Sequence, residues 1–150
     1  MKKAKPPQFD IRNLQRRIQV NIGGLRKFGQ EAAGLCLGLP AKRRTELQTL
    51  TQVSVLIVSD RRMTSLHRRF MNEPGPTDVI TFQHGEIFIG ADTALRNARR
   101  FGNSLDRELR LYIVHGLLHL HGFEDTDAES AGKMRRAERS ILTKVGRPRV

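Results

Sequence analysis

Two histidines four residues apart are the feature of this sequence that most clearly suggests chemistry. His115 and His119 lie in the stretch HGLLHLHGFED, residues 115–125. Side chains four residues apart lie on the same face of a helix, so both imidazoles can reach one metal ion. Gly122 favours an end to that helix, because glycine readily adopts the left-handed conformation found there. The chain that follows offers three carboxylates as a third ligand: Glu124, Asp125 and Asp127.

Three protein ligands with a fourth position open to water are typical of a catalytic zinc ion. Three of the five histidines fall within seven residues, on a stretch that is otherwise apolar. Because unliganded polar rings are costly to bury, we expect a single zinc site. His121 points to a different face from His119, so we expect a cap or surface residue there. Zinc proteases of the H-E-x-x-H type carry a glutamate where this chain has Gly116, which argues against a peptidase.

The charge of the chain favours a polyanionic partner. Lys and Arg number 27 against 15 Asp and Glu, which gives a net charge of +12. Neutralising phosphates releases condensed counterions, so nucleic acid is the first candidate. An anionic membrane surface is the second, but no strongly amphipathic basic helix stands out. Aromatic residues make up only 5% of the chain, with no Trp. We therefore expect RNA binding through the backbone rather than by stacking on an aromatic platform.

The hydrophobic periodicity predicts the elements that position these residues. Strands are expected over 9–14, 52–59, 77–83 and 86–90, and helices over 22–35, 61–71, 91–101, 105–121 and 127–144. The stretch 105–121 is apolar nearly all round, so it should be a buried central helix that carries the metal histidines. The sequence therefore predicts an α+β fold, with a small mixed sheet of about four strands packed against about five helices.

A length of 150 residues fits one domain. We expect a disordered basic tail over 1–8, a single domain over 9–145 and a loose basic tail over 146–150. Cys36 lies in an apolar run, so we expect it in the core. No apolar stretch is long enough to span a membrane, and no apolar segment of a secretory signal follows the basic N-terminus. These features predict a cytoplasmic protein with no membrane association.

The metal stretch resembles the signature H-G-x-L-H-L-x-G-[YF]-D-H of the YbeY family of rRNA maturation factors. Upstream, residues 76–82 resemble the family's P-T-D-V-L-S-F, residues 85–87 its G-D-I, and residues 107–109 its R-E-L. Met134 and Glu138 resemble the M-x-x-x-E of its last helix. Together these similarities cover residues 50–142 in the family's order and spacing.

The resemblance implies a zinc-dependent endoribonuclease that acts in ribosomal RNA processing, including 3′-end maturation of the small-subunit RNA, and in ribosome quality control. Counting along the motif places Asp125 at the third ligand position, which is usually histidine in the family. Aspartate also binds zinc, so the resemblance implies that His115, His119 and Asp125 hold one Zn²⁺. Further catalytic residues are not assigned. The implied partners are ribosomal RNA, the small ribosomal subunit, ribosomal proteins and a GTPase of ribosome assembly.

Clustered arginines are the candidates for RNA contacts. We predict such contacts from Arg61, Arg62, Arg68 and Arg69, because guanidinium groups neutralise phosphates well. Lys42, Arg43 and Arg44 form a further basic cluster. Many family members have an arginine after the aromatic residue that aligns with Phe70, whereas this chain has Met71.

A second interpretation is not enzymatic. The chain could be a ribosome-assembly factor that binds rRNA or a ribosomal protein, with zinc in a structural role. The substitutions at Met71 and Asp125 favour this alternative slightly. A metal-dependent hydrolase for another substrate, such as a peptide, is disfavoured by Gly116 and by the positive charge.

Overall fold

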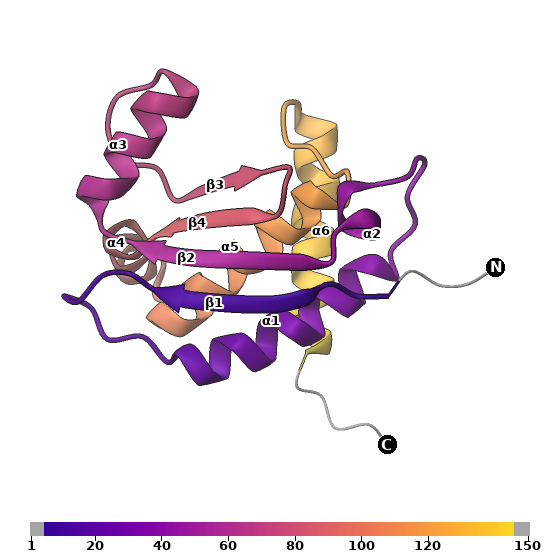
Figure 1. Cartoon of the computed structure of the whole chain (residues 1–150), viewed down its shortest axis with the longest axis horizontal. Coiled ribbons are helices and arrows are strands. Elements are labelled where there is room, and N and C mark those ends of the chain that lie inside the picture. The colour runs from indigo at the N-terminus through magenta and orange to yellow at the C-terminus, as the bar shows by residue number, and fades with distance from the viewer. Residues whose placement is uncertain (1–4, 146–150) are drawn as a thin grey trace.

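Four strands and six helices lie along residues 5–145, the part of the chain that the computed structural model describes (Figure 1). They are β1 (Gln8–Asn13), α1 (Ile22–Leu37), α2 (Glu46–Thr49), β2 (Gln52–Val58), α3 (Asp60–Met71), β3 (Val79–Phe82), β4 (Glu86–Gly90), α4 (Ala91–Phe101), α5 (Leu105–Leu120) and α6 (Ala128–Lys144). The predicted α+β architecture is confirmed. The single-turn helix α2 was not predicted, because four residues are too few to show a hydrophobic period.

The strands form one mixed sheet in the order β1-β2-β4-β3. Strand β2 pairs in parallel with β1 and with β4, so Val55 lies between Ile11 and Ile87. Strands β3 and β4 pair antiparallel as a hairpin. Gly85 in its turn has a φ of 104°, a conformation that favours glycine. The interior position of β2 explains why both of its faces are apolar.

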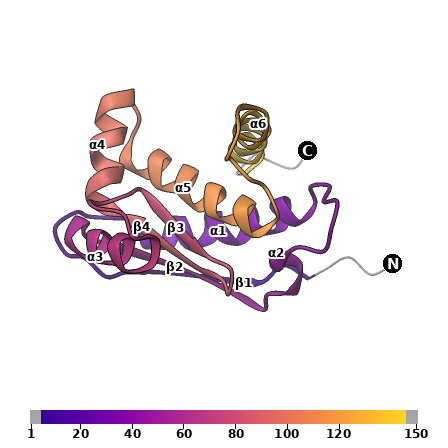
Figure 2. The same ribbon diagram turned by 90° about the horizontal axis from the view of Figure 1, so that it is seen from above.

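The main core lies between one face of the sheet and helices α1 and α5 (Figure 2). Val53, Val55 and Ile57 of β2 point into it, as the two-residue period of a strand requires. Helix α5 contributes many fully buried side chains and also contacts α1, α4 and α6. The prediction of a buried central helix is therefore confirmed.

A smaller core occupies the other face of the sheet, under helix α3. It contains Val58, Met63, Ile80 and Phe88. Only Met63 of α3 is buried, and the end of the helix projects beyond the sheet in Figure 1.

The regular elements run from Gln8 to Lys144. Residue 8 was placed in the N-terminal tail by the sequence analysis, but it belongs to β1 because its backbone N–H donates to Thr51 O at 2.9 Å. Residues 1–4 and the C-terminal tail over 146–150 lie outside the described residues. Cys36 is fully buried, as predicted. Within residues 5–145, no helix combines the length and apolar character needed to cross a membrane.

Candidate metal centre and its basic pocket

The last two turns of α5 carry the two histidines of the motif. Helix α5 packs against the sheet and against α1, α4 and α6, and His115 and His119 lie on its partly open side. Their side chains are 26% and 27% exposed. Gly122 has a φ of 90° and turns the chain back after the helix, as predicted.

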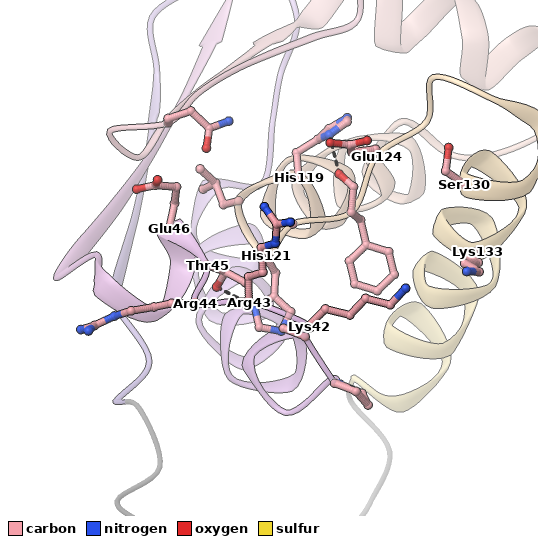
Figure 3. A pocket seen from close by; sticks show the side chains of 16 residues that line it. Lys42, Arg43, Arg44, Thr45, Glu46, His119, His121, Glu124, Ser130 and Lys133 are labelled. Atoms are coloured by element: carbon pink, nitrogen blue, oxygen red, sulfur yellow. Dashed lines mark hydrogen bonds between the residues drawn. The ribbon is translucent and has the colours of Figure 1, made fainter.

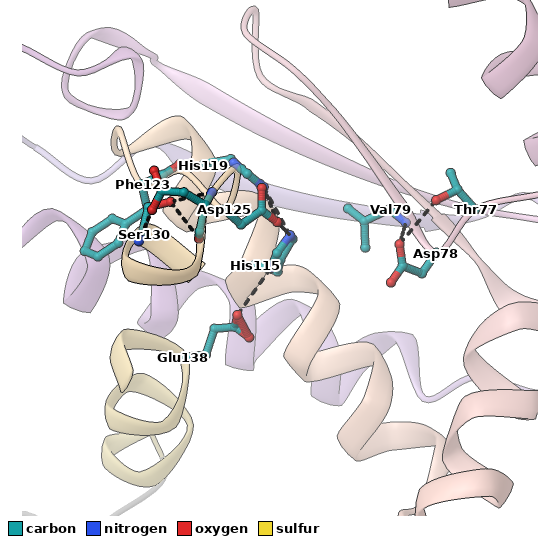
Figure 4. A network of polar contacts seen from close by, with 10 residues as sticks. Thr77, Asp78, Val79, His115, His119, Phe123, Asp125, Ser130 and Glu138 are labelled. Atoms are coloured by element: carbon teal, nitrogen blue, oxygen red, sulfur yellow. Dashed lines mark hydrogen bonds and ion pairs between the residues drawn. The ribbon is translucent and has the colours of Figure 1, made fainter. Parts of the chain in front are cut away.

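The turn after α5 brings Asp125 to the two imidazoles (Figure 4). The Nε2 atoms of His115 and His119 lie 3.1 Å apart. Asp125 Oδ2 lies 3.5 Å from the first Nε2 and 3.8 Å from the second. A tetrahedral zinc ion bound at about 2.0–2.1 Å holds its ligand atoms about 3.4 Å apart. The three donor atoms therefore have the separations that such an ion requires.

The structure distinguishes Asp125 from the two other carboxylates of the turn. Asp127 is the N-cap of α6, where its Oδ1 accepts from Ser130 N at 2.7 Å. Glu124 lines a neighbouring pocket. Among the described residues, the grouped donor atoms belong to His115, His119 and Asp125, the trio implied by the family resemblance.

The outer ring nitrogens of both histidines have acceptors. His119 Nδ1 lies 3.1 Å from Phe123 O, and His115 Nδ1 lies 3.3 Å from Glu138 Oε1 (Figure 4). A carbonyl or carboxylate oxygen selects the tautomer in which Nδ1 carries the hydrogen. Both Nε2 lone pairs then face each other, which is unfavourable without a cation between them. This is the arrangement by which histidine ligands are oriented toward a metal.

The environment shifts the pKa values of the two imidazoles in opposite directions. Burial lowers the pKa of His115, but the hydrogen bond and charge of Glu138, helped by Asp125 and Asp78, outweigh it and raise the pKa above its ordinary value. Burial, and then the neighbouring His115, lower the pKa of His119. Neutral His119 is the form that binds metal.

A pocket of about 480 Å³ adjoins the metal centre (Figure 3). Its walls are the loop before α2, the end of α5 and the first turns of α6. His121 joins two of these walls. Its Nδ1 lies 3.0 Å from Thr45 Oγ1 and its Nε2 lies 2.9 Å from Leu39 O. His121 is the C-cap of α5 and is 2% exposed, so the expectation of a cap is confirmed and that of a surface residue is wrong.

The arginines predicted to bind RNA lie elsewhere. Arg61, Arg62, Arg68 and Arg69 are exposed on α3, at the opposite end of the sheet from α2 in both views (Figures 1 and 2). Of the residues described, none of these four lines the pocket beside His119.

Sequence reasoning matched Glu138 to the family's last helix without giving it a role, and it expected His121 to be only a cap or surface residue. Glu138 lies on a different helix, 23 residues beyond His115, so its approach depends on how α6 packs on α5. The position of His121 beside Gly122, at the end of the predicted helix, was the available signal for its capping role.

The model of the family described as Endoribonuclease YbeY matches residues 10–146. This chain belongs to the YbeY family. The match includes every strand except the first two residues of β1, together with all six helices and the metal centre.

Individual YbeY relatives are about one-third identical to the chain over the aligned residues. Endoribonuclease YbeY of Nautilia profundicola is 36% identical over 111 residues, which cover 68% of this chain and 78% of that protein. The protein of the same name from Frankia casuarinae is 32% identical over 117 residues, or 65% of this chain and 58% of that protein. The chain thus spans under two thirds of the longer relative.

A solved structure has a similar fold. The solution structure of a protein from Thermotoga maritima superimposes with a TM-score of 0.58 at 24% sequence identity. The superposition covers 93% of this chain and 99% of that protein. At this identity the likeness establishes the fold alone.

Proposed function

We propose that the chain is a zinc-dependent endoribonuclease that processes ribosomal RNA, including the 3′ end of the small-subunit RNA. The observation that carries the proposal is the convergence of His115 Nε2, His119 Nε2 and Asp125 Oδ2 beside a pocket with a cationic rim. Membership of a family whose named members are endoribonucleases supports the reaction type.

The residues present fit one zinc ion, held by His115, His119 and Asp125. When bound, such an ion supplies Lewis acidity toward a phosphoryl oxygen and activates water. Glu138 and the carbonyl of Phe123 hold the two rings in the orientation that binding needs. Cationic side chains of the pocket offset the negative charge of the RNA backbone at the centre.

The position at which a peptidase base would stand, Gly116, lies on the buried side of α5 against β4. A Cβ built on Gly116 would lie 2.8 Å from Ile87 Cδ1, so no larger side chain fits there without displacing α5 from β4. This argues against the glutamate that an H-E-x-x-H peptidase carries at this position.

Under this proposal, residues 9–145 form one catalytic domain that works in the cytoplasm, in rRNA processing and ribosome quality control. Its partners are the small ribosomal subunit with its RNA, ribosomal proteins and an assembly GTPase. The exposed arginines of α3 are further RNA contacts, remote from the cleavage centre.

The decisive experiment combines zinc content with cleavage of a structured rRNA fragment. The variants are His119→Ala and Asp125→Ala, with Glu31→Ala on α1 as a control that removes an exposed carboxylate away from the metal centre and its pocket. We expect wild type and the control to hold one zinc and to cut. The two ligand variants should remain folded and bind RNA, but neither hold zinc nor cut.

The opposite pattern would favour a non-catalytic assembly factor with a structural zinc. In that case the wild type binds RNA and never cuts, and the ligand variants melt at lower temperature and lose RNA binding together. Zinc-dependent cleavage of a broad peptide library would instead indicate a peptidase.

A further inference from the structure

The pocket beside His119 is a separate site from the metal centre and has its own chemistry. Its volume of about 480 Å³ is in the range of small-ligand sites. His119 is the only one of the three grouped metal-binding residues that lines it, so the pocket opens beside the centre rather than around it. Figure 3 shows Lys42 on the loop at one side and Lys133 on α6 at the other.

The charge of the pocket is mainly positive. Lys42, Arg43, Arg44 and Lys133 line it, against the carboxylates of Glu46 and Glu124. Within residues 5–145, no ion pair engages the three cations of the loop. Lys133 has only an exposed pairing with Glu129 at 3.6 Å, and such pairs contribute little. The cations of the pocket are thus available to a ligand.

The loop that carries these cations is fixed rather than free. Both ring nitrogens of buried His121 bond to it, one to Thr45 Oγ1 and one to Leu39 O. Thr45 also forms a capping box with Gln48 at the start of α2. The exposed residues 42–44 are therefore held between two anchored ends. Cations that are already positioned lose less entropy when they bind a ligand.

Apolar surface completes the pocket. Phe123 and Leu120 line it together with the cations, and Phe123 is only partly buried. Cations beside one aromatic ring suit a ligand that has both phosphates and a flat base. Single-stranded RNA has this combination, because its unpaired bases can turn outward and stack on aromatic side chains.

We propose that this pocket binds a nucleotide of single-stranded RNA next to the bond to be cut, with its phosphates on Lys42, Arg43 and Lys133 and its base over Phe123. This inference rests on the proposed function, because the metal centre defines which bond is cut. It adds a subsite whose cations come from the loop before α2 and from α6, rather than from α3.

The test is the affinity of the metal-loaded full chain for a single-stranded 2′-O-methyl oligoribonucleotide of about six nucleotides, which fits the site sizes of such proteins. Fluorescence anisotropy would measure the affinity at several salt concentrations. The test variant is Lys42→Ala with Lys133→Ala. The matched control is Arg12→Ala with Lys27→Ala, which removes two exposed charges from β1 and α1.

We expect the test variant to weaken binding on the order of tenfold and the control to change it little. The slope of log K against log salt concentration should become shallower by about 1.4, because each phosphate contact to a single strand contributes about 0.7. Phe123→Leu keeps the backbone carbonyl that His119 uses and should weaken binding with the slope unchanged.

Three results would overturn the proposed role of the pocket: no binding by wild type, equal weakening of binding in both double variants, or an unchanged salt slope in the test variant. Cleavage of the rRNA fragment separates the two proposals. If wild type cuts and the test variant binds normally, the subsite is wrong and the nuclease function stands. If the test variant alone loses affinity and wild type never cuts, the pocket is a nucleotide-binding site, and both the nuclease function and the place of the pocket beside a cleaved bond are wrong.

Discussion

Glu138 Oε1 lies 3.3 Å from Nδ1 of His115, on the side of the ring opposite to Asp125. The two residues belong to different helices, α6 and α5, and the carboxylate side chain is only 12% exposed. A buried carboxylate in this position fixes the tautomer of the imidazole and increases its basicity as a ligand. The packing of α6 on α5 therefore contributes directly to the metal centre.

This contact predicts that Glu138→Ala weakens zinc binding by about 10–100-fold, because the His115 ring loses its acceptor and its fixed orientation. Glu138→Gln should weaken zinc binding less, since its amide oxygen can still accept the hydrogen bond. Competition with a chromophoric chelator would give the affinities, and Co²⁺ absorption would show a change in ligand geometry. Glu129→Ala, on the same helix but exposed, serves as the control. Equal affinities in Glu138→Ala and wild type would contradict the role of Glu138.

Gly116→Ala should destabilise the fold by about 1–3 kcal/mol, because the new methyl group would overlap Ile87 on β4. Gly34→Ala is the matched control on α1. A Cβ there has no neighbour within 4 Å, so its free energy of unfolding should rise by up to about 1 kcal/mol through helix propensity. Urea unfolding would measure both. Partial rescue of Gly116→Ala by Ile87→Val would identify the overlap as the cause, and a stabilised Gly116→Ala would refute it.

His121→Ala should lower the free energy of unfolding by about 1–3 kcal/mol, because the loop atoms Thr45 Oγ1 and Leu39 O lose a buried partner. The zinc content should stay at the wild-type value, and the affinity for the oligoribonucleotide should fall as the basic loop loosens. His84→Ala removes a 65% exposed imidazole from the hairpin. It should change neither the free energy of unfolding nor the affinity for the oligoribonucleotide. Loss of zinc from His121→Ala would show that this ring belongs to the metal centre instead.

Stability should decrease in alkaline solution because of Cys36. Burial raises the pKa of this thiol from 9.0 to about 12. Between these values the unfolded chain releases the thiol proton and the native chain keeps it, so the native state binds more protons and the free energy of unfolding falls as pH rises. The slope from this group approaches about 1.4 kcal/mol per pH unit.

Denaturant unfolding at several pH values above about 8 would measure this effect in wild type and in Cys36→Ala. The variant starts from a lower stability because it leaves a small cavity, but its stability should fall less steeply with pH. If the stability of wild type and of Cys36→Ala fell equally steeply with pH, the effect would not come from Cys36. The native thiol should also react with a disulfide reagent only after unfolding, since thiolate is the reactive form.

The fold was largely predictable because its elements have clear periods. The alternation of Val53, Val55 and Ile57 indicated a strand, and the nearly all-apolar run of 105–121 indicated the buried helix. Pairing order was not predictable from these patterns, since nothing in β1 specifies that it adds to β2 at the edge. Helix α2 was not predicted, because its structure depends on the Thr45 capping box rather than on a hydrophobic stripe.

The candidate site was predictable as far as it is local in sequence. Helical spacing brings His115 and His119 together, and the glycine turn returns the chain toward Asp125. The contacts of Glu138 and His121 depend on tertiary packing, over 23 residues in one case and over 76 and 82 in the other. No spacing rule covers such distances, so the partners of these two residues emerged only from the structure.

The three grouped donor side chains all lie between residues 115 and 125, and this has a consequence for folding. Closing so short a loop costs little chain entropy, so a zinc ion can stay attached to the unfolded polypeptide. An ion that binds both states stabilises the native one only by the difference between the two affinities. Chelation should therefore lower the melting temperature modestly. Zinc present during synthesis could hold the end of α5 and its turn together before the sheet has formed.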